Sequence, residues 1–181
     1  ALIVLCSVLL SYQYFTKKDS VSKELSIAVL PFDNLSSEDG TEIFRDGITE
    51  DILTQLSKLK ELRVISRTSV MQYKGTKKTI PEIAKELGVT YVLEGSIRKY
   101  GDDIRITAQL IDAASDEHLW AENYDKTLTN IFSLQTEVSK EIVDALQINL
   151  SFDEQQGLAV IPTKNIEAYK LFLAGRNEAD K

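Results

Sequence analysis

The residues that could do acid–base or metal chemistry are few. Asp46, Glu50 and Asp51 lie close together, and Asp46 and Glu50 are four residues apart, so they share one face if the segment is helical. Two carboxylates on one face could bind a hard cation or act as an acid–base pair. The simpler interpretation is a solvated helix face. His118 is the single histidine. It lies beside Trp120 on a strand-like segment without a recognisable nucleophile motif nearby, so we predict a structural role for it.

The sequence indicates neither a cofactor nor a metal. Cys6 is the single cysteine and, together with His118, cannot supply a zinc cage. The residues after the first predicted strand, 33–36, contain neither G-x-G-x-x-G nor G-K-[ST], which excludes the common nucleotide-binding loops. We therefore predict no catalytic, cofactor-binding or metal-binding residue, and no enzymatic activity for this segment.

The charges are unevenly distributed along the chain. The net charge is −7 at pH 7, which argues against nucleic-acid binding because phosphate affinity requires an excess of Lys and Arg. Residues 58–78, in contrast, contain seven basic residues and one acidic residue. This segment could bind an anionic partner, lipid headgroups or the acidic helix face of a second copy, although a solvated basic loop is the simpler interpretation. The candidate surface consists of Lys58, Lys60, Arg63, Arg67, Lys74, Lys77 and Lys78, and Arg67 is the first residue to test.

Hydrophobic periodicity predicts the elements that must position these residues. Apolar residues recur at helical spacing in 43–59, 80–87 and 131–146. Alternating or continuous apolar runs predict five strands. The expected fold class is α/β, with a mixed five-stranded sheet, the order β-α-β-α-β-β-β-α and helices mainly on one face. The strands are expected at Ser26–Phe32, Leu62–Ser66, Thr90–Tyr100, Asp103–Asp112 and Glu117–Asp125. Four aromatic residues on these strands could face outward as a binding surface or pack in the core: Tyr91, Tyr100, Trp120 and Tyr124.

Local signals support this order. Thr79 and Glu82 form a capping box, and Gly88 is the expected left-handed terminator of the helix that follows it. Gly101 begins a two-residue turn between two strands. Gly47 lies inside a helical stripe, where glycine costs about 1 kcal/mol relative to alanine, so we expect another part of the chain to approach its backbone closely.

Both ends of the sequence suggest neighbouring segments. Residues 1–15 form a largely apolar run that ends in aromatic residues, and Lys17 and Lys18 follow shortly after. This pattern predicts that residues 1–16 are the C-terminal part of a transmembrane helix rather than a cleaved signal peptide or a core helix. A helix begins near Asn165 and has no evident partner, so we expect it to belong to a further domain. The predicted organisation is a transmembrane helix (1–16), a linker (17–23), an α/β domain (24–150), a second linker (151–164) and the start of a helical region (165–181).

Four stretches of the sequence resemble a known bacterial family. They are SIAVLPFDNLSS (26–37), residues 46–76, residues 83–99 and residues 105–142. They resemble the TolB amino-terminal-like domain of membrane-anchored tetratricopeptide-repeat proteins, which is also found in CadC-like regulators and class III adenylate cyclases. The resemblance covers about residues 24–150, and it implies that residues 165–181 begin the repeats.

The resemblance implies a non-catalytic, extracytoplasmic protein-interaction or sensory module of a single-pass inner-membrane protein, with this domain in the periplasm. Its partner would be one or more proteins, and a homodimer is left open. The alternative is the regulatory region of a membrane-bound class III adenylate cyclase, or of a winged-helix transcriptional regulator. In either case the output domain would lie outside this segment.

Overall fold

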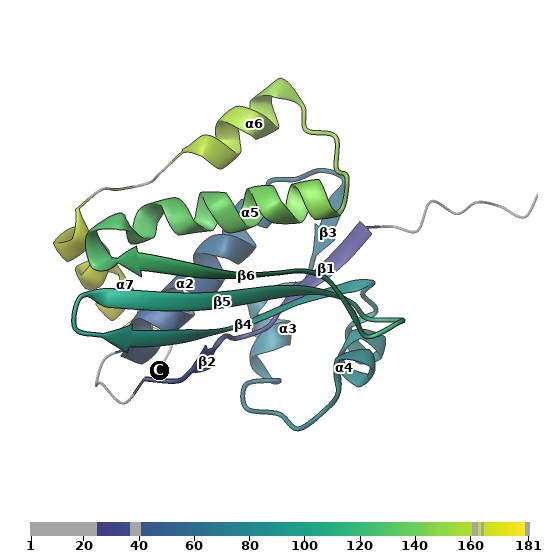
Figure 1. Cartoon of the computed structure of the whole chain (residues 1–181), viewed down its shortest axis with the longest axis horizontal. Helices are drawn as coiled ribbons and strands as arrows, with labels where there is room; N and C mark the ends of the chain where they lie inside the picture. The colour runs from purple at the N-terminus through teal and green to yellow at the C-terminus, as the bar shows by residue number, and fades with distance from the viewer. Residues whose placement is uncertain (1–24, 37–40, 161–162, 164, 180–181) are drawn as a thin grey trace, which may run out of the picture.

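The chain folds around one mixed β-sheet (Figure 1). The computed structural model describes residues 25–36, 41–160, 163 and 165–179. The strands are β1 (Leu25–Val29), β2 (Asp33–Asn34), β3 (Leu62–Val64), β4 (Tyr91–Tyr100), β5 (Asp103–Asp112) and β6 (Glu117–Thr127). The helices are α2 (Thr41–Leu56), α3 (Arg67–Met71), α4 (Ile80–Leu87), the 3-10 helix η1 (Leu128–Ser133), α5 (Leu134–Ala145), α6 (Phe152–Ala159) and α7 (Ile166–Ala179).

The sheet has a parallel and an antiparallel half, as predicted. Its order is β3-β1-β4-β5-β6; β1 pairs parallel with β3 and β4, whereas β4, β5 and β6 form an antiparallel meander. The expectation of five strands is wrong, because β2 adds a sixth by pairing parallel with β4. Pro31 has no N–H to donate, so the chain leaves the ladder after Leu30 and resumes pairing at Asp33.

The main hydrophobic core lies between one face of the sheet and the helices α2 and α5. Strict alternation along β5 supplies Ile104, Ile106 and Leu110 to this face, and each is at most 2% exposed. A smaller hydrophobic cluster packs α4 against the opposite face of the sheet, and it contains Ile83 of α4 and Val92 of β4. The helices therefore cover mainly one face, and α4 accounts for part of the other.

Local signals in the sequence are confirmed around α4. The Glu82 carboxylate accepts hydrogen bonds from the Thr79 amide at 2.8 Å and from its hydroxyl at 2.9 Å, which completes the capping box. Gly88 ends the helix with a φ of 64°, and Gly101 begins the β4–β5 turn with a φ of 59°. These features follow from short-range hydrogen bonding and backbone freedom, so they can be predicted from a few residues.

The C-terminal part differs from expectation. Residues 152–159, predicted to be part of a linker, form α6; Ser151 and Glu154 cap it, and Leu158 is 1% exposed in the main core. The helix near Asn165 was expected to lack a partner, but α7 packs on α2 and buries Tyr169 and Leu173 in the same core. The folded unit thus extends beyond residue 150, while the division into domains stays a prediction.

The predicted transmembrane segment, residues 1–16, lies outside the described residues. None of the helices that the structure describes combines the length and apolar character needed to cross a membrane.

Candidate functional site: the polar seam of α2

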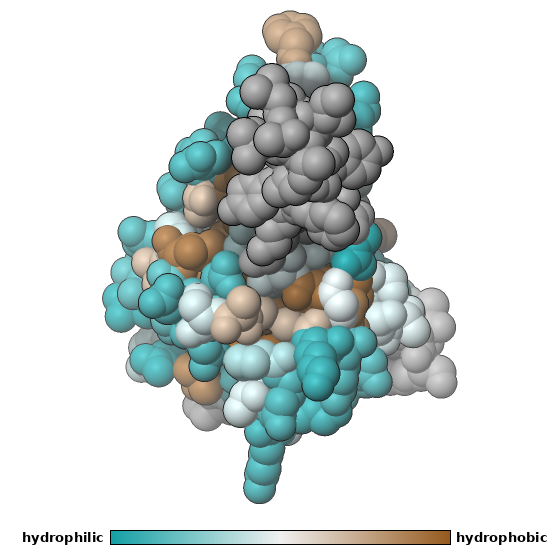
Figure 2. Space-filling view, turned by 90° about the vertical axis from the view of Figure 1, so that its right-hand side faces the viewer, coloured by the Kyte–Doolittle hydropathy of each residue, from teal (hydrophilic) through white to brown (hydrophobic). Residues whose placement is uncertain are grey.

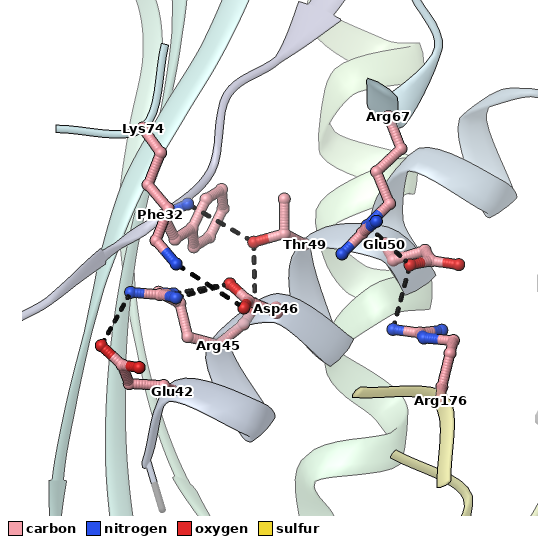
Figure 3. A network of polar contacts seen from close by, with 9 residues as sticks. All are labelled: Phe32, Glu42, Arg45, Asp46, Thr49, Glu50, Arg67, Lys74 and Arg176. Carbon is pink, nitrogen blue, oxygen red and sulfur yellow. Dashed lines mark hydrogen bonds and ion pairs between the residues drawn. The ribbon is translucent and has the colours of Figure 1, made fainter. Parts of the chain in front are cut away.

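A row of charged and hydroxyl side chains joins α2 to α3, to the loop after α3 and to α7 (Figure 3). We call it the polar seam; its residues are Arg45, Asp46, Glu50, Asp51, Arg67, Lys74, Tyr169 and Arg176.

Glu50 is the centre of the seam. Its Oε2 atom lies 3.1 Å from Nε of Arg67 and 3.0 Å from Nη2 of Arg176, so one carboxylate joins α2 to both α3 and α7. The Glu50 side chain is 25% exposed, and water therefore screens its charge only partly. Ion pairs that are shielded in this way contribute more than fully exposed ones, and removing one partner leaves a poorly solvated charge.

Asp51, the residue after Glu50 on α2, accepts a hydrogen bond from the Tyr169 hydroxyl at 2.6 Å. Burial raises the pKa of the Asp51 carboxyl above its ordinary value of 3.8, and the Tyr169 hydrogen bond and the charge of Arg176 oppose this shift. Burial and the neighbouring Asp51 also raise the pKa of the Tyr169 hydroxyl well above its ordinary value. The Tyr169 ring meets Phe132 edge-to-face at 5.3 Å, so the same residue joins polar and apolar contacts.

Gly47 allows α7 to approach α2 this closely. A Cβ atom at this position would lie 2.6 Å from Cδ2 of Leu173 and 3.1 Å from the Tyr169 hydroxyl oxygen. The close approach expected from the sequence is therefore confirmed, and its partner is α7.

The first half of α2 is held by Arg45, which is 4% exposed. Its Nε atom donates to Asp46 Oδ1 at 2.7 Å, and Asp46 Oδ2 lies 3.9 Å from Lys74 Nζ (Figure 3). The Thr49 hydroxyl donates to the Arg45 carbonyl at 2.9 Å and accepts from the Phe32 amide at 3.4 Å. These contacts fix α2 against the segment that links β1 and β2.

The carboxylates singled out in the sequence thus do not lie on a freely solvated helix face. Asp46 and Glu50 are held in ion pairs, and Asp51 accepts from a tyrosine. Among the described residues, no three His, Cys, Asp or Glu side chains are grouped in a way that could hold a metal ion. His118 is exposed on β6. The seam is suited to holding helices together.

The structure does not bring the seven predicted basic residues into one surface. Arg67 and Lys74 belong to the seam. Lys78 pairs with Glu86 at 2.7 Å and lies 5.6 Å from the centre of the Tyr73 ring. The remaining four contact other elements or solvent: Lys58 donates to the Gln55 side chain and the Gly157 carbonyl, the Lys60 amide donates to Glu154, Arg63 donates to the Gly88 carbonyl, and Lys77 is exposed.

These positions divide the basic window among several parts of the surface. Figure 2 shows the end of the molecule at which β1 begins, where hydrophilic residues alternate with smaller hydrophobic areas. Anion binding by the seven residues stays a prediction. Of the four aromatic residues, Tyr100 is 84% exposed, whereas Tyr91, Trp120 and Tyr124 pack against the main core.

Sequence reasoning missed Arg45, which lies within α2 beside Asp46, and the two side chains that α7 contributes from a distant segment, Tyr169 and Arg176. The sequence contains one usable signal, because Gly47 in a helical stripe and the spacing of Tyr169 and Leu173 on α7 together suggest two helices in close contact. Nothing in the local sequence identifies Arg176 as the partner of Glu50.

Comparison with known proteins places this geometry in a class. TolB from Acinetobacter baumannii superposes with a TM-score of 0.50 and 20% identity, over 67% of this chain and 28% of that one. The lipoprotein GNA1162 from Neisseria meningitidis has a TM-score of 0.48 and 18% identity, over 70% of this chain and 99% of that one. The fold is that of a TolB-like domain, as the sequence resemblance predicts.

The sequence comparisons are more specific. The family described as "HilA/YgeH-like transcriptional regulator, second domain" matches residues 22–141, and the chain belongs to this family. A protein of Rhizobium meliloti (strain 1021) named "Putative adenylate cyclase 3" is 48% identical over 151 residues, which are 83% of this chain and 26% of that protein. The chain therefore spans about a quarter of the length of this relative.

Proposed function

We propose that this chain is a non-catalytic protein-interaction or sensory module that regulates an output domain of a larger bacterial membrane protein. The observation that carries the proposal is that the same kind of domain accompanies two different outputs. The 48% identical relative is named as an adenylate cyclase, and the family is named for transcriptional regulators. A part shared by both cannot be the specific output of either, which supports a regulatory role.

The polar seam supplies a physical connection for such regulation. Glu50 and Asp51 hold Arg176 and Tyr169 of α7, so a change in the position of α2 alters the contacts of α7 and of the repeats that we expect after it. A bound partner transmits a signal through this connection only by its difference in affinity for two arrangements of the helices.

For the location, we propose a single-pass inner-membrane protein with this domain in the periplasm. The apolar residues 1–15, the aromatic residues at their end and the family resemblance support this arrangement. Alkaline phosphatase and green fluorescent protein fused after Lys181 in the full-length protein test it. Phosphatase activity with a dark fluorescent fusion is expected, and the reverse pattern contradicts the periplasmic location.

The relative named as a cyclase makes adenylate cyclase the output to test first. The full-length protein is expected to form cAMP in a host lacking its own cyclase, and the 181-residue chain is expected to form none. Glu50→Gln should change cAMP formation by about fivefold or more, as expected for a coupling of roughly 1 kcal/mol. Glu61→Gln, an exposed matched control, should leave it unchanged.

The outcomes separate the candidates. Formation of cAMP by the 181-residue chain alone contradicts the non-catalytic role. Transcription activation without cAMP from the full-length protein favours the winged-helix alternative. An unaltered output in Glu50→Gln contradicts coupling through the polar seam.

A further inference from the structure

Strand β6 forms one long edge of the sheet, and α5 packs alongside it (Figure 1). It is the terminal strand of the order β3-β1-β4-β5-β6, has 11 residues and, among the residues that the structure describes, pairs only with β5 (Figure 1). The strand at the opposite edge, β3, has only three residues. Alternate residues of an edge strand direct their N–H and C=O groups outward, where they form a template for another strand.

The edge between Trp120 and Lys126 contains neither a proline nor a bulge, and its charged side chains determine which strand can pair with it. The register irregularity of β6 lies earlier, opposite Leu110 and Ile111. From Trp120 onward the register with β5 is regular, so every second residue directs its N–H and C=O groups outward. Ala121, Glu122, Asn123 and Asp125 are exposed.

The charge of this edge indicates what can bind there. Lys126 pairs with Glu137 of α5, and Arg105 pairs with Asp125, which leaves the exposed Glu122 and Glu141 without an ion-pair partner among the described residues. Glu122 lies two residues before Tyr124 on the same side of β6, and Glu141 belongs to α5, which packs against β6. Burial, followed by the charges of Glu141, Glu122 and Glu137, raises the pKa of Tyr124 far above its ordinary value.

Two hydrogen-bond donors at the same edge are unused. Trp120 Nε1 and the Tyr124 hydroxyl are shielded from solvent and have no hydrogen-bond partner within the described part of the chain. Their rings are 6.4 Å apart on the side of β6 that packs toward the core. A shielded, unpaired donor costs about 1–3 kcal/mol, but because both donors lie on the core side they do not form part of the outward edge itself.

We propose that the edge of β6 is the docking site for an extended basic segment of a partner protein, which adds to the sheet as a further strand with Lys or Arg directed toward Glu122 and Glu141. The inference rests on the proposed interaction role and names its partner class. Main-chain hydrogen bonds would supply part of the affinity, and the carboxylates would supply the preference for basic side chains. A second copy fits less well, because two β6 edges would bring the same excess of acidic groups together.

Amide NMR of the 181-residue chain tests the proposal with three peptides of equal length. The first is acetyl-Lys-Val-Lys-Thr-Lys-Val-Lys-Thr-amide; the second has Glu in place of every Lys; the third keeps the lysines but has Pro in place of the central Thr. The first should shift the amides of β6 saturably, with a Kd below about 1 mM at about 20 mM salt. The glutamate peptide should not bind, and the proline peptide should bind at least about tenfold more weakly because it cannot complete the ladder.

Variants locate the site. Glu122→Lys combined with Glu141→Lys should weaken binding of the lysine peptide by about tenfold or more, whereas Glu61→Lys, the same change near the opposite edge of the sheet, should not. Saturable shifts centred outside β6, equal binding of the proline peptide, or no binding overturns the inference. Concentration-dependent shifts of β6 without peptide also overturn it, in favour of a second copy. None of these results affects the cAMP experiment, so the two proposals fail separately.

Discussion

Replacing Gly47 by alanine tests whether α7 is docked on α2, because the same methyl group has opposite effects in the two situations. In an open helix the change stabilises by about 1 kcal/mol. In the folded chain the new Cβ would lie 2.6 Å and 2.8 Å from the two methyl carbons of Leu173, which is 2% exposed and has little room to move. Overpacking of this kind costs about 1–3 kcal/mol, so Gly47→Ala should be neutral or destabilise by up to about 2 kcal/mol.

Leu173→Ala removes the methyl groups that conflict and completes a double-mutant cycle. Alone it should cost about 2–5 kcal/mol, since it leaves a cavity in the core. In this background Gly47→Ala should stabilise by about 1 kcal/mol or more, because the helix gain remains and the new methyl fills part of the cavity. The expected coupling free energy is therefore about 1–3 kcal/mol.

Urea unfolding followed by the fluorescence of Trp120, the single tryptophan, measures all four proteins. Gly157→Ala in α6 is the matched control. Its Cβ would meet only Lys58 Cδ, at 3.9 Å, so its effect should add to that of Leu173→Ala within about 0.5 kcal/mol. Equal stabilisation by Gly47→Ala with leucine and with alanine at position 173 would refute the docking of α7.

Two further predictions concern acid dependence, and they have opposite signs. The raised pKa of Asp51 stabilises the folded state below about pH 3.8, and this contribution is lost as the pH rises through the raised value. The stability of Asp51→Asn relative to the native chain should therefore increase from about pH 4 to about pH 7 in urea titrations. A decrease over this range would contradict the prediction. Hydrogen bonds from the Lys60 amide and from Ser151 lower the pKa of Glu154 to about 2, so its contribution is present above about pH 4.5 and is lost as the pH falls toward 2. The stability advantage of the native chain over Glu154→Gln should shrink between pH 6 and pH 3, and an advantage that does not change would show that the cap is unformed; Asp153→Asn on the same helix is the control.

Features set by short stretches of sequence could be predicted, and features set by distant partners could not. The stripe of α2, the capping box of α4 and the alternation of β5 depend on neighbours a few residues apart. β2 could not be predicted because a proline, here Pro31, commonly ends the pairing of a strand, whereas in this chain it interrupts the ladder only briefly. Asp33 and Asn34 form a strand only because they pair with β4, which lies about 60 residues further along the chain.

The same distinction applies to the polar seam. The spacing of Asp46 and Glu50 places them on one face of α2, but whether that face is solvated depends on Arg67 and Arg176, which reach it from α3 and α7. Clustering of charge in the sequence was also a poor guide to clustering in space. Short elements after α2 turn the basic residues in different directions, and several meet an acidic or carbonyl oxygen nearby.

The two proposed sites are joined by one continuous set of packed elements. β6 packs against α5, α5 packs against α2, and α2 holds α7 through Gly47, Glu50 and Asp51. Contact alone does not establish coupling, which requires an element with two arrangements whose balance both sites alter. If α7 is that element, the lysine peptide and the Glu50→Gln change must each alter the hydrogen-exchange protection of α7. By linkage, docking of α7 changes the affinity for the peptide by the same factor as the peptide changes the docking equilibrium, so Glu50→Gln must alter the peptide affinity by up to that factor. A peptide that binds β6 and leaves α7 unaffected would make β6 an attachment site only, and regulation would then have to act through another surface.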